Sequence, residues 1–169
     1  MSNASNVNQS VTAYIALGSN LDDPIKYVKT GFDEVANISQ SRLIKSSSLY
    51  GSAPIGEHYS GQPDFVNAVA QIETSLSPQQ LLKALLFIEV KYGRDRRLPN
   101  AARTLDLDLL LYGDKRVDEI DLVVPHPRMH TRAFVLMPLV EIDNDCIIPE
   151  KGLAREWLQY VNEQELYKL

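Results

Sequence analysis

The sequence predicts a single globular domain of the α+β class, and three observations lead to the three parts of this prediction. Strand-like and helix-like segments alternate irregularly along the chain, and some of the links between them have only the length of a hairpin turn. The composition, with 44% hydrophobic and 23% charged residues, is close to that of an average globular protein. The length of 169 residues suits one domain. We expect a loose polar tail over residues 1–10 and a single domain over residues 11–169.

The first elements follow from hydrophobic periodicity and from helix-capping residues. Residues 11–17 alternate with a period of two and predict a strand. Asp23 and Pro24 predict the start of a helix, with Asp as the cap and Pro in the first helical position. Two further apolar runs, over residues 43–49 and 65–72, predict the next strands.

The second helix has the clearest signals in the chain. Ser77 and Gln80 stand in the spacing of a capping box, and Gly93 supplies the expected end. Two irregular loops flank the middle of the chain. Residues 51–63 hold three Gly and two Pro, and residues 94–102 are rich in Arg.

The rest of the chain is predicted in four pieces. Residues 104–112 form a strand, and residues 117–124 form short extended structure. Residues 127–142 are expected to be partly helical. Residues 153–166 are expected to form a last amphipathic helix around Trp157.

Charge and cysteine content exclude several classes of function. The chain has 17 Lys and Arg against 22 Asp and Glu, a net charge of −5. We therefore expect no binding to nucleic acid or to an anionic membrane, because both rely on a basic surface. No apolar run approaches the roughly 20 residues of a membrane span, and residues 1–10 lack the features of a secretory signal. A single cysteine, Cys146, fits a reducing compartment, and we expect a cytoplasmic location.

Asp106 and Asp108 are the strongest candidates for metal binding. Because side chains alternate across a strand, the two carboxylates face one side, and the leucines that alternate with them face the core. Carboxylate oxygens about 7 Å apart along a strand suit Mg²⁺, which also takes substrate phosphates as ligands. The alternative is a solvated polar strand face. Asp is a poor strand former, however, so two on one apolar strand favour a function.

Basic side chains precede this strand. Four arginines, Arg94, Arg96, Arg97 and Arg103, fall within ten residues of an acidic chain. The planar guanidinium group suits phosphate oxygens, so the cluster predicts a polyphosphate clamp, although a solubilising surface would give the same pattern. Glu89 lies at the edge of an apolar helix stripe, one turn before these arginines, and is either an exposed charge or a ligand contact.

Two further pairs complete the set of candidate residues. His126 and His130 would lie four residues apart on a helix that began at Pro127, but no third zinc ligand is evident, so His126 is interpreted as a phosphate contact. Phe65 and Asn67 share a strand face, where a ring and an amide could hold a flat heterocycle. No Walker A loop or nucleophile elbow is present.

Several motifs in one order resemble the 6-hydroxymethyl-7,8-dihydropterin pyrophosphokinase family of folate biosynthesis. The resemblance runs from about residue 12 to beyond residue 138. Its motifs are ALGSNL (16–21), SAPIG (52–56), QPDFVNA (62–68), Glu89 with GRDR (93–96), RTLDLDL (103–109) and PHPRMHTRAF (125–134). The chain departs from the family at residues 99–102, where many members carry a Trp that closes over the substrate.

The resemblance implies a ferredoxin-like sandwich with a mostly antiparallel sheet, and transfer of the β,γ-diphosphate of ATP to the pterin hydroxymethyl group. It also implies a monomer acting on these two small molecules, with two Mg²⁺ ions. The implied site residues are Asp106 and Asp108 for metal and catalysis, Arg94 and Arg103 for catalysis, Glu89, Arg96, His126 and Arg132 for ATP, and Ser52, Ala53, Pro54, Ile55, Phe65, Asn67 and Phe134 for the pterin.

Two alternatives remain open from the residues alone. One is another Mg²⁺-dependent nucleotidyl or glycosyl transferase built on the Asp106 and Asp108 pair. The other is a non-catalytic ferredoxin-like module that binds a ligand. Pterin-dependent formation of AMP distinguishes the kinase from both.

Overall fold

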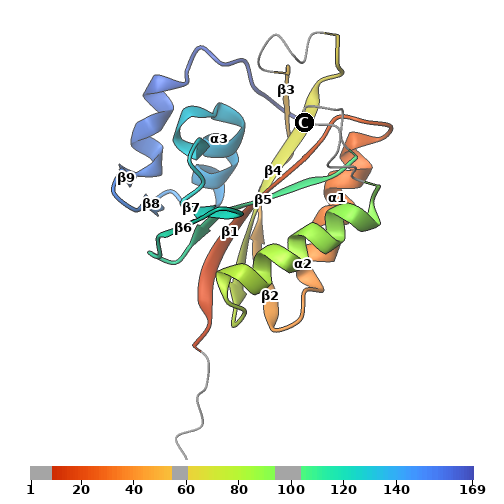
Figure 1. Ribbon diagram of the computed structural model, residues 1–169. Helices are drawn as coiled ribbons and strands as arrows, with labels where there is room; N and C mark the ends of the chain where they lie inside the picture. Colours follow the sequence, from red (N-terminus) through yellow and green to blue (C-terminus); the bar gives the residue numbers. More distant parts are fainter. Residues whose placement is uncertain (1–8, 55–60, 94–103) are drawn as a thin grey trace, which may run out of the picture.

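The computed structural model describes residues 9–54, 61–93 and 104–169. Its centre is a six-stranded antiparallel sheet (Figure 1). The strands are β1 (Val11–Ser19), β2 (Ser41–Ser46), β3 (Tyr50–Ser52), β4 (Phe65–Thr74), β5 (Asp106–Tyr112) and β10 (Tyr167–Lys168). They lie in the order β10-β3-β4-β1-β5, and β2 also pairs with β4.

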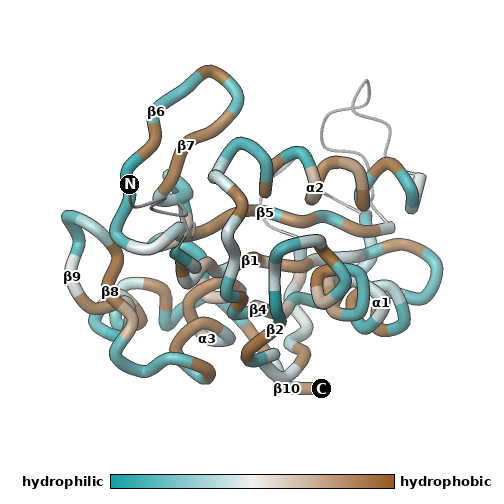
Figure 2. Tube along the Cα trace, turned by 90° about the horizontal axis from the view of Figure 1, so that it is seen from below, coloured by the Kyte–Doolittle hydropathy of each residue, from teal (hydrophilic) through white to brown (hydrophobic). Residues whose placement is uncertain are grey.

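Helices cover both faces of this sheet, as the view in Figure 2 shows. α1 (Pro24–Ala36) and α2 (Pro78–Lys91) pack on one face, and α3 (Ala133–Ile142) packs on the other with the 3₁₀ helix η3 (Ala154–Tyr160). The α+β class and the ferredoxin-like sandwich are thereby confirmed. The remaining elements are β6 (Val117–Glu119), β7 (Leu122–Val124), η2 (Met129–Thr131), β8 (Ile147–Ile148) and β9 (Gly152–Leu153).

The two predicted helix starts are confirmed. The Asp23 carboxylate accepts a hydrogen bond of 3.2 Å from the N–H of Lys26 at the start of α1. At the start of α2, the Ser77 hydroxyl accepts from the Gln80 N–H, and the Gln80 side chain accepts from the Ser77 N–H. Each cap satisfies backbone donors that have no partner within the helix.

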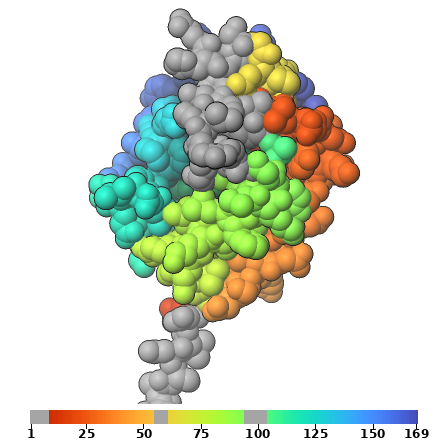
Figure 3. Space-filling view, turned by 45° about the vertical axis from the view of Figure 1, so that its right-hand side comes forward, coloured from red at the N-terminus to blue at the C-terminus, as the bar shows by residue number. Residues whose placement is uncertain are grey.

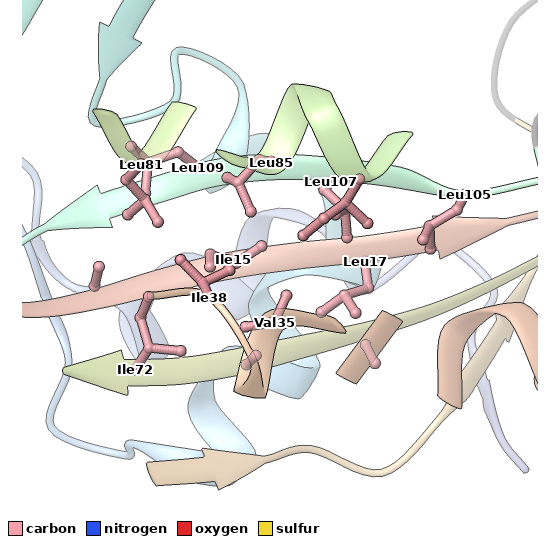
Figure 4. Close-up of a cluster of buried hydrophobic side chains, with 14 of the residues drawn as sticks. Ile15, Leu17, Val35, Ile38, Ile72, Leu81, Leu85, Leu105, Leu107 and Leu109 are labelled. Carbon is pink, nitrogen blue, oxygen red and sulfur yellow. The ribbon is translucent and has the colours of Figure 1, made fainter. Parts of the chain in front are cut away.

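Two hydrophobic clusters, one on each face, hold the layers together. The cluster under α1 and α2 is drawn in Figure 4, where leucines of α2 meet leucines of β5 and apolar residues of β1. It includes Ile15, Leu17, Leu81, Leu85, Leu105, Leu107 and Leu109. The cluster under α3 includes Tyr14, Val69, Leu110, Leu111, Met129, Leu136 and Leu139. The layers are therefore fixed independently on the two sides of β1, β4 and β5.

α2 is also held at its two ends on the surface seen in Figure 3, where it lies between the β6–β7 hairpin and α1. At one end, the Gln79 side chain donates to the Glu119 carboxylate, 2.9 Å away. At the other end, Lys91 forms an ion pair of 2.6 Å with Glu34 of α1. These contacts fix the position of α2 beside β5.

The predicted last helix over residues 153–166 is wrong. Only residues Ala154–Tyr160 are helical, in a 3₁₀ conformation, and the chain then turns and ends in β10. The reason is tertiary pairing. β10 adds a strand to β3, and the Trp157 indole N–H donates to the Lys151 carbonyl, so local helix propensity is overridden.

The predicted strand over residues 43–49 is confirmed over residues 43–46, within β2, and is wrong over residues 47–49. β2 ends at Ser46, and β3 begins at Tyr50. At Ser47 the side-chain hydroxyl accepts a bond of 2.9 Å from the Val69 N–H, so a side chain takes the place of the backbone in the ladder. The predicted loop over residues 51–63 correspondingly starts inside β3, and its residues 55–60 lie outside the described part of the chain.

Candidate active site

Three strands bring polar side chains into one row at one end of the sheet. Gly18 of β1 is paired with Asn67 of β4 on one side and with Asp106 of β5 on the other. Paired residues of an antiparallel ladder project from the same face, and Val69, two residues after Asn67, lies in the cluster under α3. The amide and the carboxylate therefore lie on the α3 side, with backbones about 10 Å apart at two strand spacings.

Asp106 and Asp108 share this face of β5, as predicted. Asp108 is paired with Ala16 of β1, and both carboxylates are half-buried. The residues that alternate with them are buried under α1 and α2: Leu105, Leu107 and Leu109. The two carboxylates fit Mg²⁺, which binds oxygen ligands and retains water or phosphate. In the part of the chain that the structure describes, no three His, Cys, Asp or Glu side chains form a metal cage, so a cation there also depends on water and substrate oxygens.

Glu89 contacts the backbone between these two aspartates. Its side chain is buried, and Oε1 accepts a hydrogen bond of 2.9 Å from the N–H of Leu107. β5 ends the order of strands in the described sheet, so its outward N–H groups have no further strand to bond. Glu89 supplies an acceptor there and fixes the strand that carries the carboxylates. The contact of Glu89 with ATP stays a prediction. Its expected position at the edge of the apolar helix stripe is corrected, because the side chain is buried.

Asn67 and Ser52 form the floor of the predicted pterin site. Both are buried, and the Asn67 Nδ2 donates to the Ser52 Oγ at 2.8 Å. Phe65, two residues before Asn67 on the same strand face, is half-buried and paired with Ser52 in the β3–β4 ladder. The structure thus brings these three predicted residues together. Ala53 and Pro54 follow directly after β3.

His126 lies between β5 and two arginines. The backbone N–H of His126 donates to the Leu110 carbonyl of β5. The ring Nδ1 of His126 accepts a bond of 3.1 Å from the backbone N–H of Arg128. Burial is the main cause that lowers the pKa of His126 to about 4; the nearby positive charges of Arg132 and Arg128 act in the same direction, and Asp106 opposes them. The ring is therefore neutral at pH 7. Because Nδ1 accepts, the ring proton is on Nε2, which makes His126 a hydrogen-bond donor without a charge.

Arg132 and Phe134 lie at the start of α3. The guanidinium carbon of Arg132 lies 5.4 Å from the centre of the Phe134 ring, a cation–π arrangement. Phe134 is half-buried against the cluster under α3. The predicted histidine pair, by contrast, does not share a helix. The His130 ring packs edge-on against Trp157, with centroids 4.8 Å apart.

Four predicted site residues lie outside the described residues: Ile55, Arg94, Arg96 and Arg103.

Sequence reasoning missed the roles of two residues that shape this region. Gly18 and Asn20 lie in the ALGSNL motif, but no site role is predicted for either. A Cβ at Gly18 would lie 3.5 Å from the Asn67 Oδ1, so the glycine keeps the row flat between amide and carboxylate. The buried Asn20 side chain donates to the Gln62 side chain at 3.0 Å and ties the end of β1 to the segment before β4. Their position directly after an apolar strand was the available signal.

Comparison with known proteins assigns this arrangement to a family. The model of the family described as 7,8-dihydro-6-hydroxymethylpterin-pyrophosphokinase (HPPK) matches residues 14–144. A 2-amino-4-hydroxy-6-hydroxymethyldihydropteridine pyrophosphokinase of Haemophilus influenzae is 43% identical over 159 residues, which cover 94% of this chain and 98% of the relative. The enzyme of the same name from Pseudomonas aeruginosa is 44% identical over 137 residues, 81% of this chain and 83% of the relative.

Solved structures agree on the fold. The HPPK-DHPS protein of Plasmodium falciparum, in a crystal structure of its A437G variant with STZ-DHP, superposes with a TM-score of 0.70 over 92% of this chain at 13% identity. The chain spans 46% of that protein, less than half its length. At this identity the match supports the fold alone.

Proposed function

The chain belongs to the 7,8-dihydro-6-hydroxymethylpterin-pyrophosphokinase family, and from this premise we propose how its residues divide the reaction among them. The reaction is the transfer of the pyrophosphoryl group of ATP to 6-hydroxymethyl-7,8-dihydropterin in folate synthesis. The pterin hydroxyl oxygen forms a bond to the β-phosphorus and releases its proton to water, the bond from the β-phosphorus to the oxygen bridging it to the α-phosphate breaks, and AMP leaves. Most of the catalysis is positioning and charge neutralisation.

Asp106 and Asp108 would hold two Mg²⁺ ions, whose positive charge would offset the charge of the ATP phosphates. Three features of the described residues support this role. The carboxylates share one face, they are half-buried, and Glu89 fixes the backbone between them. The buried Glu89 side chain of α2, which accepts from Leu107 of the edge strand β5, keeps both carboxylates in place before a substrate binds.

Basic and neutral donors contact the rest of the nucleotide. Arg94 and Arg103 act on the transferring phosphates, and Arg96, Arg132 and His126 bind ATP. Glu89, an acceptor rather than a donor, is also proposed to contact ATP. The neutral His126 donates from Nε2 to a phosphate oxygen, and its lowered pKa supports this protonation state at pH 7. A donor that is already protonated at Nε2 needs no proton uptake when ATP binds.

The pterin lies over the Asn67 end of the row. Phe65 and Phe134 stack on its two faces, and Asn67 hydrogen-bonds its polar edge. The wall beside them consists of Ser52, Ala53, Pro54 and Ile55. The bond from Asn67 to Ser52 supports this assignment, because it fixes the orientation of the amide.

The observation that carries the proposal is the row Asn67–Gly18–Asp106, which puts a heterocycle-binding amide and a metal-binding carboxylate about 10 Å apart on one face. That span suits a pterin whose hydroxymethyl group points toward metal-bound phosphates. We further propose that residues 11–169 act as one domain, as a monomer in the cytoplasm.

The test is product analysis. The protein is incubated with ATP, Mg²⁺ and 6-hydroxymethyl-7,8-dihydropterin, and nucleotides are separated by anion-exchange chromatography. AMP should form only when the pterin is present, in equal amount to the pterin diphosphate. Formation of ADP, or AMP at the same rate without pterin, would contradict the proposal.

A further inference from the structure

Residues 164–169 reach the candidate active site from the far side of β3, and we propose that two of their side chains, Gln164 and Tyr167, are positioning residues for its two walls. Gln164 contacts the start of α3, and Tyr167 contacts β3 and the residue before β4. The inference rests on the proposed function only through the roles given to Phe65, Arg132 and Phe134.

Gln164 supplies the missing cap of α3. Arg132 is the N-cap residue of this helix, and its side chain makes no capping hydrogen bond. The Gln164 Oε1 instead accepts from the Ala133 N–H at 2.9 Å, and its Nε2 donates to the Thr131 carbonyl at 2.9 Å. The two bonds hold the backbone on both sides of Arg132, and they satisfy a helix donor that has no intrahelical partner.

This arrangement has a consequence for Arg132 and Phe134. Ser, Thr, Asp or Asn normally fill the N-cap position, because their short side chains bond the first N–H groups. Since Gln164 does this from 32 residues along the chain, the N-cap position can carry an arginine, whose guanidinium lies over the Phe134 ring. Arg132, a predicted site residue, thereby occupies the N-cap position of α3, which a capping side chain would otherwise have to occupy.

Tyr167 holds the opposite wall. In the β10–β3 ladder it is paired with Gly51, and its ring lies so close that a Cβ at Gly51 would come within 2.2 Å of it. Its hydroxyl donates to the Asp64 Oδ2 at 2.9 Å. Gly51 directly precedes Ser52, and Asp64 directly precedes Phe65. One tyrosine therefore contacts the neighbours of two predicted pterin residues.

The wall needs such support because β3 has only three residues. Beyond Tyr167, the Leu169 N–H donates to the Leu49 carbonyl at 2.9 Å and continues the pairing. On the other side of β3, the Glu141 carboxylate of α3 accepts from the Ser48 N–H and hydroxyl and from the Tyr50 hydroxyl. β3 is thus held from both sides, and residues 164–169 connect it to the start of α3.

The test compares ligand affinities of single variants by calorimetry, for an unreactive ATP analogue with Mg²⁺ and for the pterin in the presence of that analogue. Tyr167→Phe keeps the ring over Gly51 and removes only the hydroxyl. It should raise the pterin Kd about fivefold, the effect of one hydrogen bond, and leave the analogue Kd within about twofold. Gln164→Ala should raise both dissociation constants about fivefold, because Arg132 and Phe134 both depend on the cap.

Matched controls come from the same region. Tyr160→Phe removes the hydroxyl of a tyrosine that is 71% exposed, and Gln159→Ala removes an exposed amide; neither should change either constant. Gln164→Glu keeps the acceptor for the Ala133 N–H but loses the donor to the Thr131 carbonyl, so it should recover only part of the affinity for both ligands. Asp64→Ala combined with Tyr167→Phe should be no weaker for the pterin than either variant alone.

Unchanged dissociation constants in folded Gln164→Ala and Tyr167→Phe would overturn the inference. So would a lower Tm with unchanged constants, which would mean that the segment only stabilises the fold. Equal losses for both ligands in Tyr167→Phe would overturn the assignment of Tyr167 to the pterin wall. Failure of the wild-type protein to form AMP from ATP and pterin would instead contradict the proposed function, and it is measured separately.

Discussion

The two ends of the central sheet are built from different side chains. At the site end, comprising residues 17–20, 65–67 and 106–108, buried polar groups are concentrated: Ser19, Asn20 and Asn67, with Ser52 and Glu89 beside them. At the far end, comprising residues 11–14, 71–74 and 109–112, β1 and β5 are mostly apolar, and Leu109, Leu110 and Leu111 are buried; β4 keeps one buried polar residue there, Thr74. The change occurs within single strands, most sharply in β5 between Asp108 and Leu109.

The difference separates the apolar residues that stabilise the sheet from the polar residues that form the candidate site. Burial of apolar area at the far end stabilises the strands in any sequence of suitable size, because the hydrophobic effect has no direction. The polar groups at the site end contribute less to the stability of the sheet, and their main effect is to fix the orientation of side chains. Each needs a particular partner, such as Ser52 for Asn67 and Leu107 for Glu89. Substitutions at the two ends should therefore change different measured quantities.

The largest effect is expected for Asp106→Asn. The variant keeps the shape of the side chain and removes a charge that the metal site needs, so kcat/KM should fall at least about a thousandfold, roughly 4 kcal/mol of transition-state stabilisation. Urea unfolding should give a free energy within about 1 kcal/mol of the wild type. Asp121→Asn, at an exposed position of the hairpin, is the matched control. Activity within tenfold of the wild type in a folded protein would exclude the metal role.

Leu85→Ala should reverse this pattern. Leu85 is fully buried between α2 and β5, and its truncation leaves a cavity that should lower the free energy of unfolding by about 2–5 kcal/mol. kcat/KM of the folded fraction, measured at low temperature, should stay within about twofold. Phe87→Ala on the same helix, where the ring is 72% exposed, should change stability by less than about 0.5 kcal/mol. Lost activity in folded Leu85→Ala would mean that catalysis also depends on the apolar packing between α2 and the sheet.

Gly18→Ala tests the row itself. The added methyl group would lie 3.5 Å from the Asn67 Oδ1, an ordinary contact, so the variant should fold with nearly unchanged Tm. It would raise the floor between the amide and the Asp106 carboxylate, and crowding of this kind should weaken pterin binding by about 1–2 kcal/mol. Calorimetry with the pterin measures the loss. Ala16→Val, at the neighbouring position opposite Asp108, is a control for added volume on β1.

The fold could be predicted as far as local signals reached. The cap of Asp23, the capping box at Ser77 and the alternation around Asp106 each depend on neighbours within four residues, and each is confirmed. The error after Tyr160 has the opposite cause. Residues 164–169 leave the helical pattern because they bond to β3 and α3, more than 30 residues or more than 100 residues away in sequence.

The site was predictable to a similar extent. Residue types with a direct chemical signal, such as Asp106, Asp108 and Asn67, are predicted as site residues; the structure brings them onto one face, and their roles stay predictions. Gly18, Gln164 and Tyr167 were not, because a glycine that leaves space or a glutamine that caps a distant helix has no signature in the sequence around it. Their contribution depends on which strands become neighbours.

The last and smallest effect concerns a buried polar group that lies away from the row. Cys146 is buried in the cluster under α3, where Tyr14 donates to the Asp143 carboxylate at 2.5 Å. Burial is the main cause that raises the pKa of Cys146 to about 12 from an ordinary value of 9; the charge of Asp143 acts in the same direction, and the hydrogen bond with Tyr14 opposes both. At pH 8 the thiolate fraction is then about 10⁻⁴ in the folded protein and about 10⁻¹ in the unfolded chain, so a thiol reagent should label the folded protein about a thousandfold more slowly.

As pH rises from 9 to 12, the Cys146 thiol of the unfolded chain loses its proton while that of the folded protein keeps it, so the free energy of unfolding should fall over that window. Cys146→Ala should flatten this dependence and leave kcat/KM within about twofold. Fast labelling of Cys146 in the folded protein, with loss of activity, would contradict this prediction. It would mean that the reaction also depends on groups outside the row Asn67–Gly18–Asp106, and not only on the polar groups at the site end of the sheet.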